Sequence, residues 1–174
     1  KKSIFFTLVV LRTGIDVNVV STLFGISDTT GSRYLTTYVS FLCRWLESEF
    51  PYPSELQIAA ALPAAIKEKW PTANLEMIFD AMEQRCQMAS SLKVYRTLFS
   101  HYKHFPTCKF LGGIAYNGAF TFCPRTAFPG SGGDVKVTRA SNLLSLLNKW
   151  SLSLADKGFM LQEDFAKNNL FLRV

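Results

Sequence analysis

The sequence has no apolar run long enough to cross a bilayer. The longest run near the start, residues 4–11, is interrupted by Thr7 and followed by Arg12. A membrane-spanning helix needs about 20 predominantly apolar residues. Lys1 and Lys2 before the run imitate a signal peptide, but no small-residue cleavage site follows. We therefore expect no membrane association. Because the sequence has no initiator methionine, we also expect the start to be a cut within a longer chain.

Cysteine is sparse, and its spacing excludes the common zinc motifs. The four cysteines lie far apart along the chain: Cys43, Cys86, Cys108 and Cys123. Zinc sites use closely paired cysteines or histidines, and the spacing of His101 and His104 suits zinc poorly on a strand. With 174 residues and 48% hydrophobic content, the chain can bury a core without disulfides. We expect reduced, mostly buried thiols in an intracellular protein.

Acidic residues are absent from residues 84–133. The same stretch carries six basic residues: Arg85, Lys93, Arg96, Lys103, Lys109 and Arg125. The formal net charge of +6 is uneven, since residues 1–70 hold seven Lys/Arg and six Asp/Glu while residues 71–174 hold twelve and seven. A solvated basic face is one interpretation of this stretch. The other is a surface for a polyanion, which favours nucleic acid as a partner.

The first seventy residues have the pattern of helices. We predict a buried helix over residues 4–11, a second over 17–24 capped by Asp16, and a third capped by Ser27 or Asp28 that reaches residue 50. The turn around Gly25 between two helices is typical of a helix-turn-helix, and an ordinary helical hairpin is the alternative. The start of the third helix would expose five polar side chains: Asp28, Thr29, Thr30, Ser32 and Arg33.

After Pro71 the pattern changes to short strands. We predict strands over residues 75–79, 107–116, 119–123, 151–155 and 170–174, with helices over 137–147 and 161–168. Asn117-Gly118 indicates a hairpin between the second and third strands. Three leading strands followed by alternating helices and strands predict a mixed sheet of ribonuclease-H-like topology. In that topology the ends of the first and fourth strands are neighbours, which would bring Asp80 and Asp156 together.

Three aspartates therefore stand in contexts suited to holding a metal ion. Asp80 and Asp156 each follow an apolar strand, and Asp134 follows a glycine-rich loop. Alternatives remain open for each of them. Asp80 would otherwise be a strand-end turn residue, and Asp156 part of an Asp-Lys-Gly turn. Asp134 is either a supporting metal ligand or the N-cap of the following helix.

An ordered set of motifs resembles Harbinger-type DDE transposases. It comprises residues 99–104 (FSHYKH), 107–111 (TCKFL), 118–122 (GAFTF), 133–138 (GDVKVT) and 155–159 (ADKGF). Residues 24–27 (FGIS) with Ser32-Arg33 are similar to the helix-turn-helix that precedes such nuclease domains. The sequence departs from the family pattern at Asp80-Ala81-Met82-Glu83, where Asp-Cys-Thr-Glu is usual. It also departs at Gly133, where a polar residue is usual, and at Gly31, where a β-branched residue is usual.

The resemblance implies an α+β or α/β fold in three parts. Residues 1–50 would form a helix-turn-helix-like module, residues 51–71 a helical connector, and residues 72–174 a ribonuclease-H-like nuclease domain. Family members place a last catalytic glutamate on a helix after the fifth strand, so we expect this domain to be truncated after that strand. Glu163 and Asp164 lie too close behind Asp156 to replace that glutamate. We therefore expect the chain to be inactive alone.

The chemistry that the resemblance implies is metal-assisted cleavage and joining of DNA phosphodiesters. Two Mg²⁺ or Mn²⁺ ions about 3.5–4 Å apart would be bridged by Asp80, with Asp156 holding one of them. The expected partners are transposon ends and target DNA, with a separate DNA-binding protein as a further candidate, and the expected location is the nucleus. Self-association is left open. Candidate phosphate contacts, for which solvation is the alternative, are Lys103, Lys109 and Lys157.

Two other hypotheses have no nuclease activity. In the first, the chain is a domesticated or decayed DNA-binding module derived from a transposase. In the second, it is a translated remnant of a dead element that folds poorly or not at all. Both hypotheses fit the departures from the family motifs.

Overall fold

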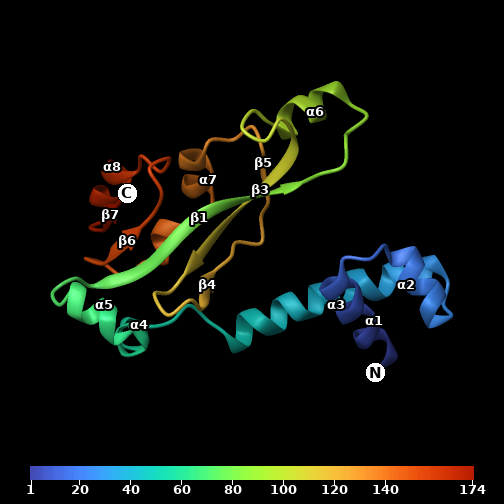
Figure 1. Ribbon diagram of the computed structural model, residues 1–174, viewed down its shortest axis with the longest axis horizontal. Helices are drawn as coiled ribbons and strands as arrows, with labels where there is room; N and C mark the ends of the chain where they lie inside the picture. Colours follow the sequence, from blue (N-terminus) through green and yellow to red (C-terminus); the bar gives the residue numbers. More distant parts are fainter. The chain divides into compact units, whose positions relative to one another are not determined.

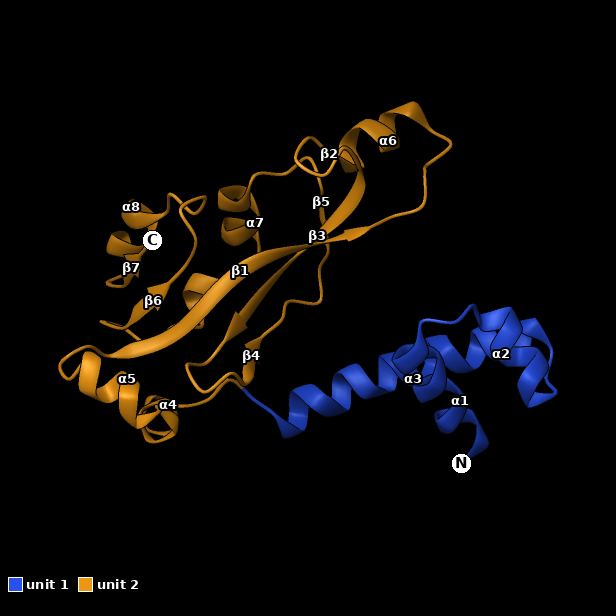
Figure 2. Cartoon of the chain, in the orientation of Figure 1, with its two compact units in different colours: residues 1–51 blue, residues 52–174 orange.

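The computed structural model describes residues 1–174 (Figure 1). The chain divides into two units, Lys1–Pro51 and Tyr52–Val174, shown in different colours in Figure 2. Each unit is described by itself below. None of the helices combines the length and the apolar character needed to cross a membrane.

Unit 1 consists of three helices whose ends follow the predicted caps. They are α1 (Lys2–Thr13), α2 (Val17–Phe24) and α3 (Asp28–Glu49). The Asp16 carboxylate accepts a hydrogen bond from the Asn18 N–H at 2.8 Å, and Ser27 Oγ accepts one from the Thr30 N–H. Gly25 ends α2 with a φ of 63°, a left-handed conformation that glycine adopts without steric cost. The predicted positions of all three helices are confirmed, but the prediction that the first helix is buried is wrong, because Phe5, Leu8 and Leu11 of α1 are exposed.

Gly31 is the one residue of α3 that is fully buried, because α3 passes close to α1 and α2 there. A Cβ atom added at Gly31 would collide with Ser21 Oγ and come within 3.0 Å of Phe6 Cζ. The core of unit 1 lies next to this contact and is formed by Phe6, Val10 and Val20. Glycine in a helix costs about 1 kcal/mol relative to alanine. A glycine is present at position 31 because the helices approach too closely there for a side chain.

Unit 2 begins with two short helices and is built around a mixed sheet. The helices α4 (Glu55–Ala61) and α5 (Ala64–Lys69) lie within the residues for which a helical connector was predicted. Two long strands follow, β1 (Leu75–Arg85) and β3 (Phe105–Ile114), with α6 (Leu92–Leu98) and β2 (Phe99–Ser100) between them. Later come β4 (Phe120–Phe122), β5 (Phe128–Pro129), α7 (Asp134–Ala140), a 3-10 turn (Leu143–Ser145), β6 (Leu152–Leu154), α8 (Gln162–Lys167) and β7 (Phe171–Arg173).

The sheet order is consistent with a ribonuclease-H-like fold. Its path is β2-β3-β1-β6-β7, and β4 and β5 also pair with β3, outside this path. The predicted hairpin is confirmed by the antiparallel pairing of β3 with β4 around Gly118, which has a φ of 86°. Strands β1, β6 and β7 are parallel, while β3 runs antiparallel to β1. The predicted adjacency of the first and fourth strands is therefore confirmed for β1 and β6.

One face of the sheet is covered by α7, the 3-10 turn and α8. Side chains from β1 and β3 meet side chains from these helices in a single core, where the Phe79 and Phe165 rings stack 5.9 Å apart. The members of this core that are fully buried are Met77, Phe79, Leu111, Val137, Leu143, Phe159, Leu161 and Phe165. The core fixes β1 against the segment that follows β6.

Two details of the expected elements were wrong. The single helix predicted over residues 137–147 is split, because Asn142 adopts a left-handed conformation with a φ of 63°. Leu143 and Leu147 still reach the core from the segment beyond this break, which is why the apolar periodicity continued through it. The expectation of mostly buried thiols also fails: the four cysteines are free, but Cys43 and Cys123 are exposed and Cys86 and Cys108 are half-buried.

Replacing Gly31 with alanine should destabilise unit 1. Overpacking costs about 1–3 kcal/mol, which exceeds the gain of about 1 kcal/mol in helix propensity. We expect a net loss of up to about 2 kcal/mol in the free energy of unfolding, measured by urea denaturation followed by circular dichroism. Ser32→Ala, at an exposed neighbouring position, is the matched control and should be neutral. Equal stability of the Gly31→Ala and Ser32→Ala variants would contradict the close approach of the helices.

Candidate active site

Asp80 and Asp156 lie at corresponding positions on two neighbouring parallel strands. Ile78 of β1 pairs with Leu154 of β6. Asp80 and Asp156 each follow their member of this pair by two residues. Side chains two residues apart along extended backbone share one face. Asp80 and Asp156, 76 positions apart in the sequence, therefore each follow the last residue pair that joins β1 and β6.

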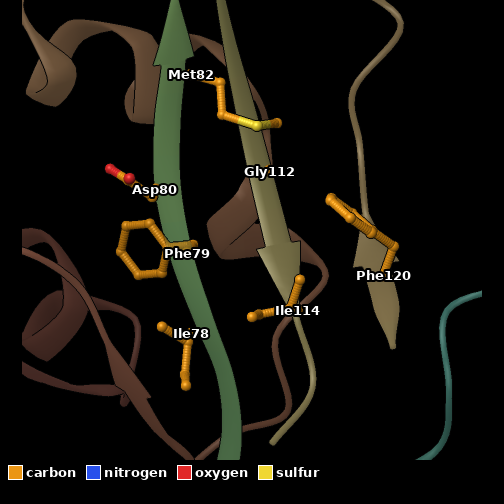
Figure 3. Close-up of a pocket in the computed structure, with 7 residues that line it drawn as sticks. All are labelled: Ile78, Phe79, Asp80, Met82, Gly112, Ile114 and Phe120. Carbon is orange, nitrogen blue, oxygen red and sulfur yellow. The ribbon is translucent and has the colours of Figure 1, made fainter. Parts of the chain in front are cut away.

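The strand that stops at this place is β6, and the expectation that Asp80 ends its own strand is wrong. Strand β1 continues to Arg85, because β3 pairs with it from Ile78 through Arg85. Strand β6 ends at Leu154, so β1 projects beyond it. The Asp80 carboxylate points away from β3 and Phe120 (Figure 3). Asp80 thus stands where β1 loses its parallel neighbour.

The surroundings of the two carboxylates are alike. Both residues are exposed, and each accepts a hydrogen bond at 2.7 Å from the backbone N–H of the following residue, Ala81 or Lys157. Neither carboxylate takes part in an ion pair. Exposed carboxylate oxygens without a cationic partner are the donors that hard divalent cations prefer. The chemistry of this pair therefore fits Mg²⁺ or Mn²⁺.

Asp134 lies beside the turn that follows β6. A Cβ added at Gly158 would be 3.3 Å from Asp134 Oδ2, so the carboxylate borders the turn from Asp156 to Phe159. The alternative that Asp134 caps α7 is wrong, because Gly133 is the N-cap and no side chain caps this helix. The structure contains no group of three or more His, Cys, Asp or Glu side chains that could hold a metal ion. Asp134 thus borders the turn that holds Asp156, and the three aspartates do not form a ligand set.

Lys109 connects Asp134 to the sheet. Its ammonium lies 2.9 Å from Asp134 Oδ1 and 3.3 Å from Glu83 Oε1, on the neighbouring strand. Glu83 also accepts a hydrogen bond from the Thr107 hydroxyl at 2.9 Å. The Lys109 side chain is only 11% exposed. Two carboxylates already share its charge, and little of the side chain is accessible to a phosphate.

The ionisation of this network follows from its contacts. Burial opposes the charged form of Glu83, but hydrogen bonds from Ser100, Thr107 and Lys109 and the charge of Lys109 hold its pKa below the ordinary value. Burial likewise opposes the charge of Lys109, but the hydrogen bonds and charges of Asp134 and Glu83 raise its pKa. Glu83 and Lys109 are therefore both charged at neutral pH.

The sequence pattern did not identify Glu83 and Glu76 as structural acids. Glu76 is buried at 2% exposure and accepts hydrogen bonds from the Tyr52 hydroxyl at 2.7 Å and from the Asn148 backbone and side chain. The alternation of side chains along β1 could have indicated that Glu83 is structural, since it lies on the same face of the strand as the core residue Phe79. No local signal marks the partners of Glu76, because Asn148 is 72 positions away.

The other predicted contacts of nucleic acid are distributed over both units. Lys103 and Lys157 are exposed, and the Lys103 ammonium lies 4.7 Å from the centre of the Tyr102 ring. In unit 1, Thr29, Ser32 and Arg33 are exposed along the first turns of α3. Thr30 is half-buried, and its hydroxyl lies 2.9 Å from Ser27 Oγ at the start of the helix.

A hollow of about 210 Å³ lies beside Asp80 on the sheet face opposite the core. It is lined mainly by apolar side chains, among them Ile78, Met82, Ile114 and Phe120 (Figure 3). Phe120 is 68% exposed. The hollow offers no second acid next to Asp80, so it adds no metal ligand.

Comparison with known proteins identifies one family. The family described as DDE superfamily endonuclease matches residues 79–170, which is more than half of the chain. The match begins one residue before Asp80 and includes Asp134 and Asp156. No curated protein and no solved structure matches the chain.

Replacing Lys109 with methionine should destabilise unit 2, because Glu83 and Asp134 lose their shared cation. Breaking a buried pair costs about 3–5 kcal/mol. We expect about 2 kcal/mol here because Asp134 is 31% exposed and water screens it. Urea denaturation at pH 7 measures the change. Lys157→Met, at an exposed position, is the control, and an equal effect of both substitutions would contradict the network.

The same variant should change the pH dependence of stability. The folded-state pKa of Glu83 is lowered, so its contribution is present above the unfolded pKa and is lost as the pH falls through the folded pKa. The wild-type chain should therefore lose part of its free energy of unfolding on acidification. In Lys109→Met the loss of stability on acidification should be smaller than in the wild-type chain. Without the lysine, Glu83 and Asp134 repel each other, and protonation of Glu83 relieves that repulsion.

Proposed function

Because the chain belongs to the DDE superfamily endonucleases, we propose that it derives from a Harbinger-type transposase and acts on DNA phosphodiesters with a divalent metal cofactor. The observation that supports this proposal is the parallel pairing of β1 with β6, in which Ile78 and Leu154, each two residues before an aspartate, are partners. Both carboxylates are exposed and free of ion pairs. Hydrolysis or transfer at a phosphodiester is the chemistry for which such a pair is suited.

Each residue of the proposed site has a separate role. Asp80 and Asp156 hold the cation, and when bound, Mg²⁺ or Mn²⁺ supplies Lewis-acid stabilisation of a phosphodiester. Asp134 borders the turn that follows Asp156 and is held in place by Lys109, which makes Lys109 a positioning residue. Lys157, next to Asp156, and Lys103 contact phosphate groups of the DNA backbone.

We assign unit 1 to DNA binding. Its second and third helices are joined by a turn at Gly25, and α3 exposes Thr29, Ser32 and Arg33 at its start. This layout resembles a helix-turn-helix, in which the N-terminal residues of the second helix contact bases. Transposon ends and target DNA in the nucleus are the proposed partners, with a separate DNA-binding protein as a further candidate.

A non-catalytic DNA-binding module is the second candidate function. The observation in its favour is that no group of three or more potential ligands surrounds Asp80 and Asp156. Such a module would keep the salt-sensitive DNA binding and lack metal-dependent cleavage. An assay of metal-dependent DNA cleavage therefore distinguishes the two candidate functions.

The catalytic proposal predicts metal-dependent nicking of supercoiled plasmid. The assay decides between this proposal and the expectation that the chain is inactive alone: under the proposal the chain nicks DNA with Mn²⁺, and Asp80→Asn or Asp156→Asn lowers the rate by at least about 100-fold, because each substitution removes a charged ligand. Gel electrophoresis of the plasmid measures the rate. Asp16→Asn, which changes an exposed cap in unit 1, is the control and should leave the rate unchanged.

Two results separate the candidate functions. Nicking that survives both Asp80→Asn and Asp156→Asn would show that the proposed pair is not the site. DNA binding without nicking in any metal would favour the non-catalytic module.

The assignment of unit 1 predicts a loss of DNA affinity when Arg33 is replaced by glutamine. Removing one phosphate contact should weaken binding several-fold and lower the salt dependence of the association constant by about one unit of its logarithmic slope. Fluorescence anisotropy of a labelled duplex at several salt concentrations measures both. Arg12→Gln, at the exposed end of α1, is the matched control. Equal effects at Arg12 and Arg33 would argue against α3 as the DNA-contacting helix.

A further inference from the structure

A second hollow, of about 260 Å³, lies between α6 and the segment that follows β2. Its lining consists of three rings and a cation: Tyr95, Arg96, Phe99 and His101. Helix α6 lies at the end of the long strands opposite α4 and α5 (Figure 1). The sequence motif FSHYKH supplies part of this lining, and neither the metal pair nor the core of unit 2 uses these side chains.

The rings form a continuous surface around Phe99. The Tyr95 and Phe99 ring centres are 5.6 Å apart with an interplanar angle of 39°. The Phe99 and His101 rings are 5.5 Å apart and nearly perpendicular, at 83°. Tyr95 and Phe99 are half-buried, whereas Arg96 and His101 are exposed at the rim. Aromatic rings inclined to one another thus line the hollow, with the exposed Arg96 and His101 at its rim.

The segment of the chain that contains this hollow has basic residues and no acidic ones. No acid occurs from residue 84 to residue 133, and the preceding acid, Glu83, is paired with Lys109. Two further cations lie over aromatic rings in the same segment: Arg85 over Phe105 at 4.8 Å and Lys103 over Tyr102 at 4.7 Å. Basic side chains interleaved with rings are the surface that binds single-stranded nucleic acid.

From this geometry we propose that the hollow binds one unpaired nucleobase of a bound DNA strand. The base stacks against Tyr95 and His101, while Arg96 contacts the adjoining phosphate. A paired base hides its faces within the duplex, so the rings would have no role in binding an intact duplex. A hollow of about 260 Å³ lies just below the range of ligand pockets, about 300–1,000 Å³, which fits one flat group. The proposal rests on the proposed action on DNA.

The test compares two labelled duplexes that differ by one unpaired 2-aminopurine. We expect the bulged duplex to bind on the order of tenfold more tightly in fluorescence anisotropy, because stacking on aromatic side chains stabilises the base. We also expect quenching of the 2-aminopurine fluorescence. Tyr95→Leu should abolish both the preference and the quenching while leaving affinity for the intact duplex unchanged.

The matched control is Tyr102→Leu, which changes an aromatic residue of the same segment that is 80% exposed and outside the hollow. It should retain the preference and the quenching. Arg96→Gln alters an exposed side chain, so it keeps the test valid if Tyr95→Leu fails to fold, and it should reduce the preference. Unfolding midpoints equal to that of the wild-type chain establish that each variant is folded.

The outcomes separate this inference from the proposed function. Equal affinity for both duplexes, or a preference that survives both Tyr95→Leu and Arg96→Gln, would overturn the nucleobase site and leave DNA binding intact. Absence of binding to either duplex would overturn both the nucleobase site and the proposed action on DNA.

Discussion

The arrangement of unit 2 depends on the pairing of β1 with strands of opposite direction on its two sides. The antiparallel pairing with β3 covers residues from Ile78 to Arg85, whereas the parallel pairing with β6 ends at Ile78 and Leu154. The longer partner keeps β1 extended after the shorter one stops. Asp80 therefore belongs to an ordered strand and still has an open side. The position of Asp156 follows from the same pairing, because it lies just beyond the end of β6.

The Lys109 network sets the position of α7 relative to this sheet. Lys109 lies on β3, Glu83 on β1 and Asp134 at the first residue of α7, so one cation links three elements. The core side chains of α7 then seal the same face, with Val137 at 2% exposure. The ion pair of Asp134 thus holds the first residue of α7, and apolar contacts such as those of Val137 hold the rest of the helix. Asp134 is held beside the turn after β6 by both.

Local features were predictable from the sequence, and features that need distant partners were not. The caps at Asp16 and Ser27 and the turn at Gly118 follow from residues within a few positions, so the pattern located them. The length of β1 depends on β3, more than twenty positions away, and its polar half gave no apolar run to detect. The adjacency of Asp80 and Asp156 was predicted only through the topology, because no local pattern links residues 76 positions apart.

Strand β1 carries three acidic residues, and each has a different set of hydrogen-bond partners. Glu76 is saturated by Tyr52 and Asn148, and Glu83 is neutralised by Lys109 and supported by Thr107. Asp80 has only its neighbouring backbone N–H. The hydrogen-bond donors of the chain therefore determine which carboxylate of the strand remains able to bind a cation. A cation from solvent would have to displace protein donors from Glu76 and Glu83, but it would meet only one backbone N–H at Asp80.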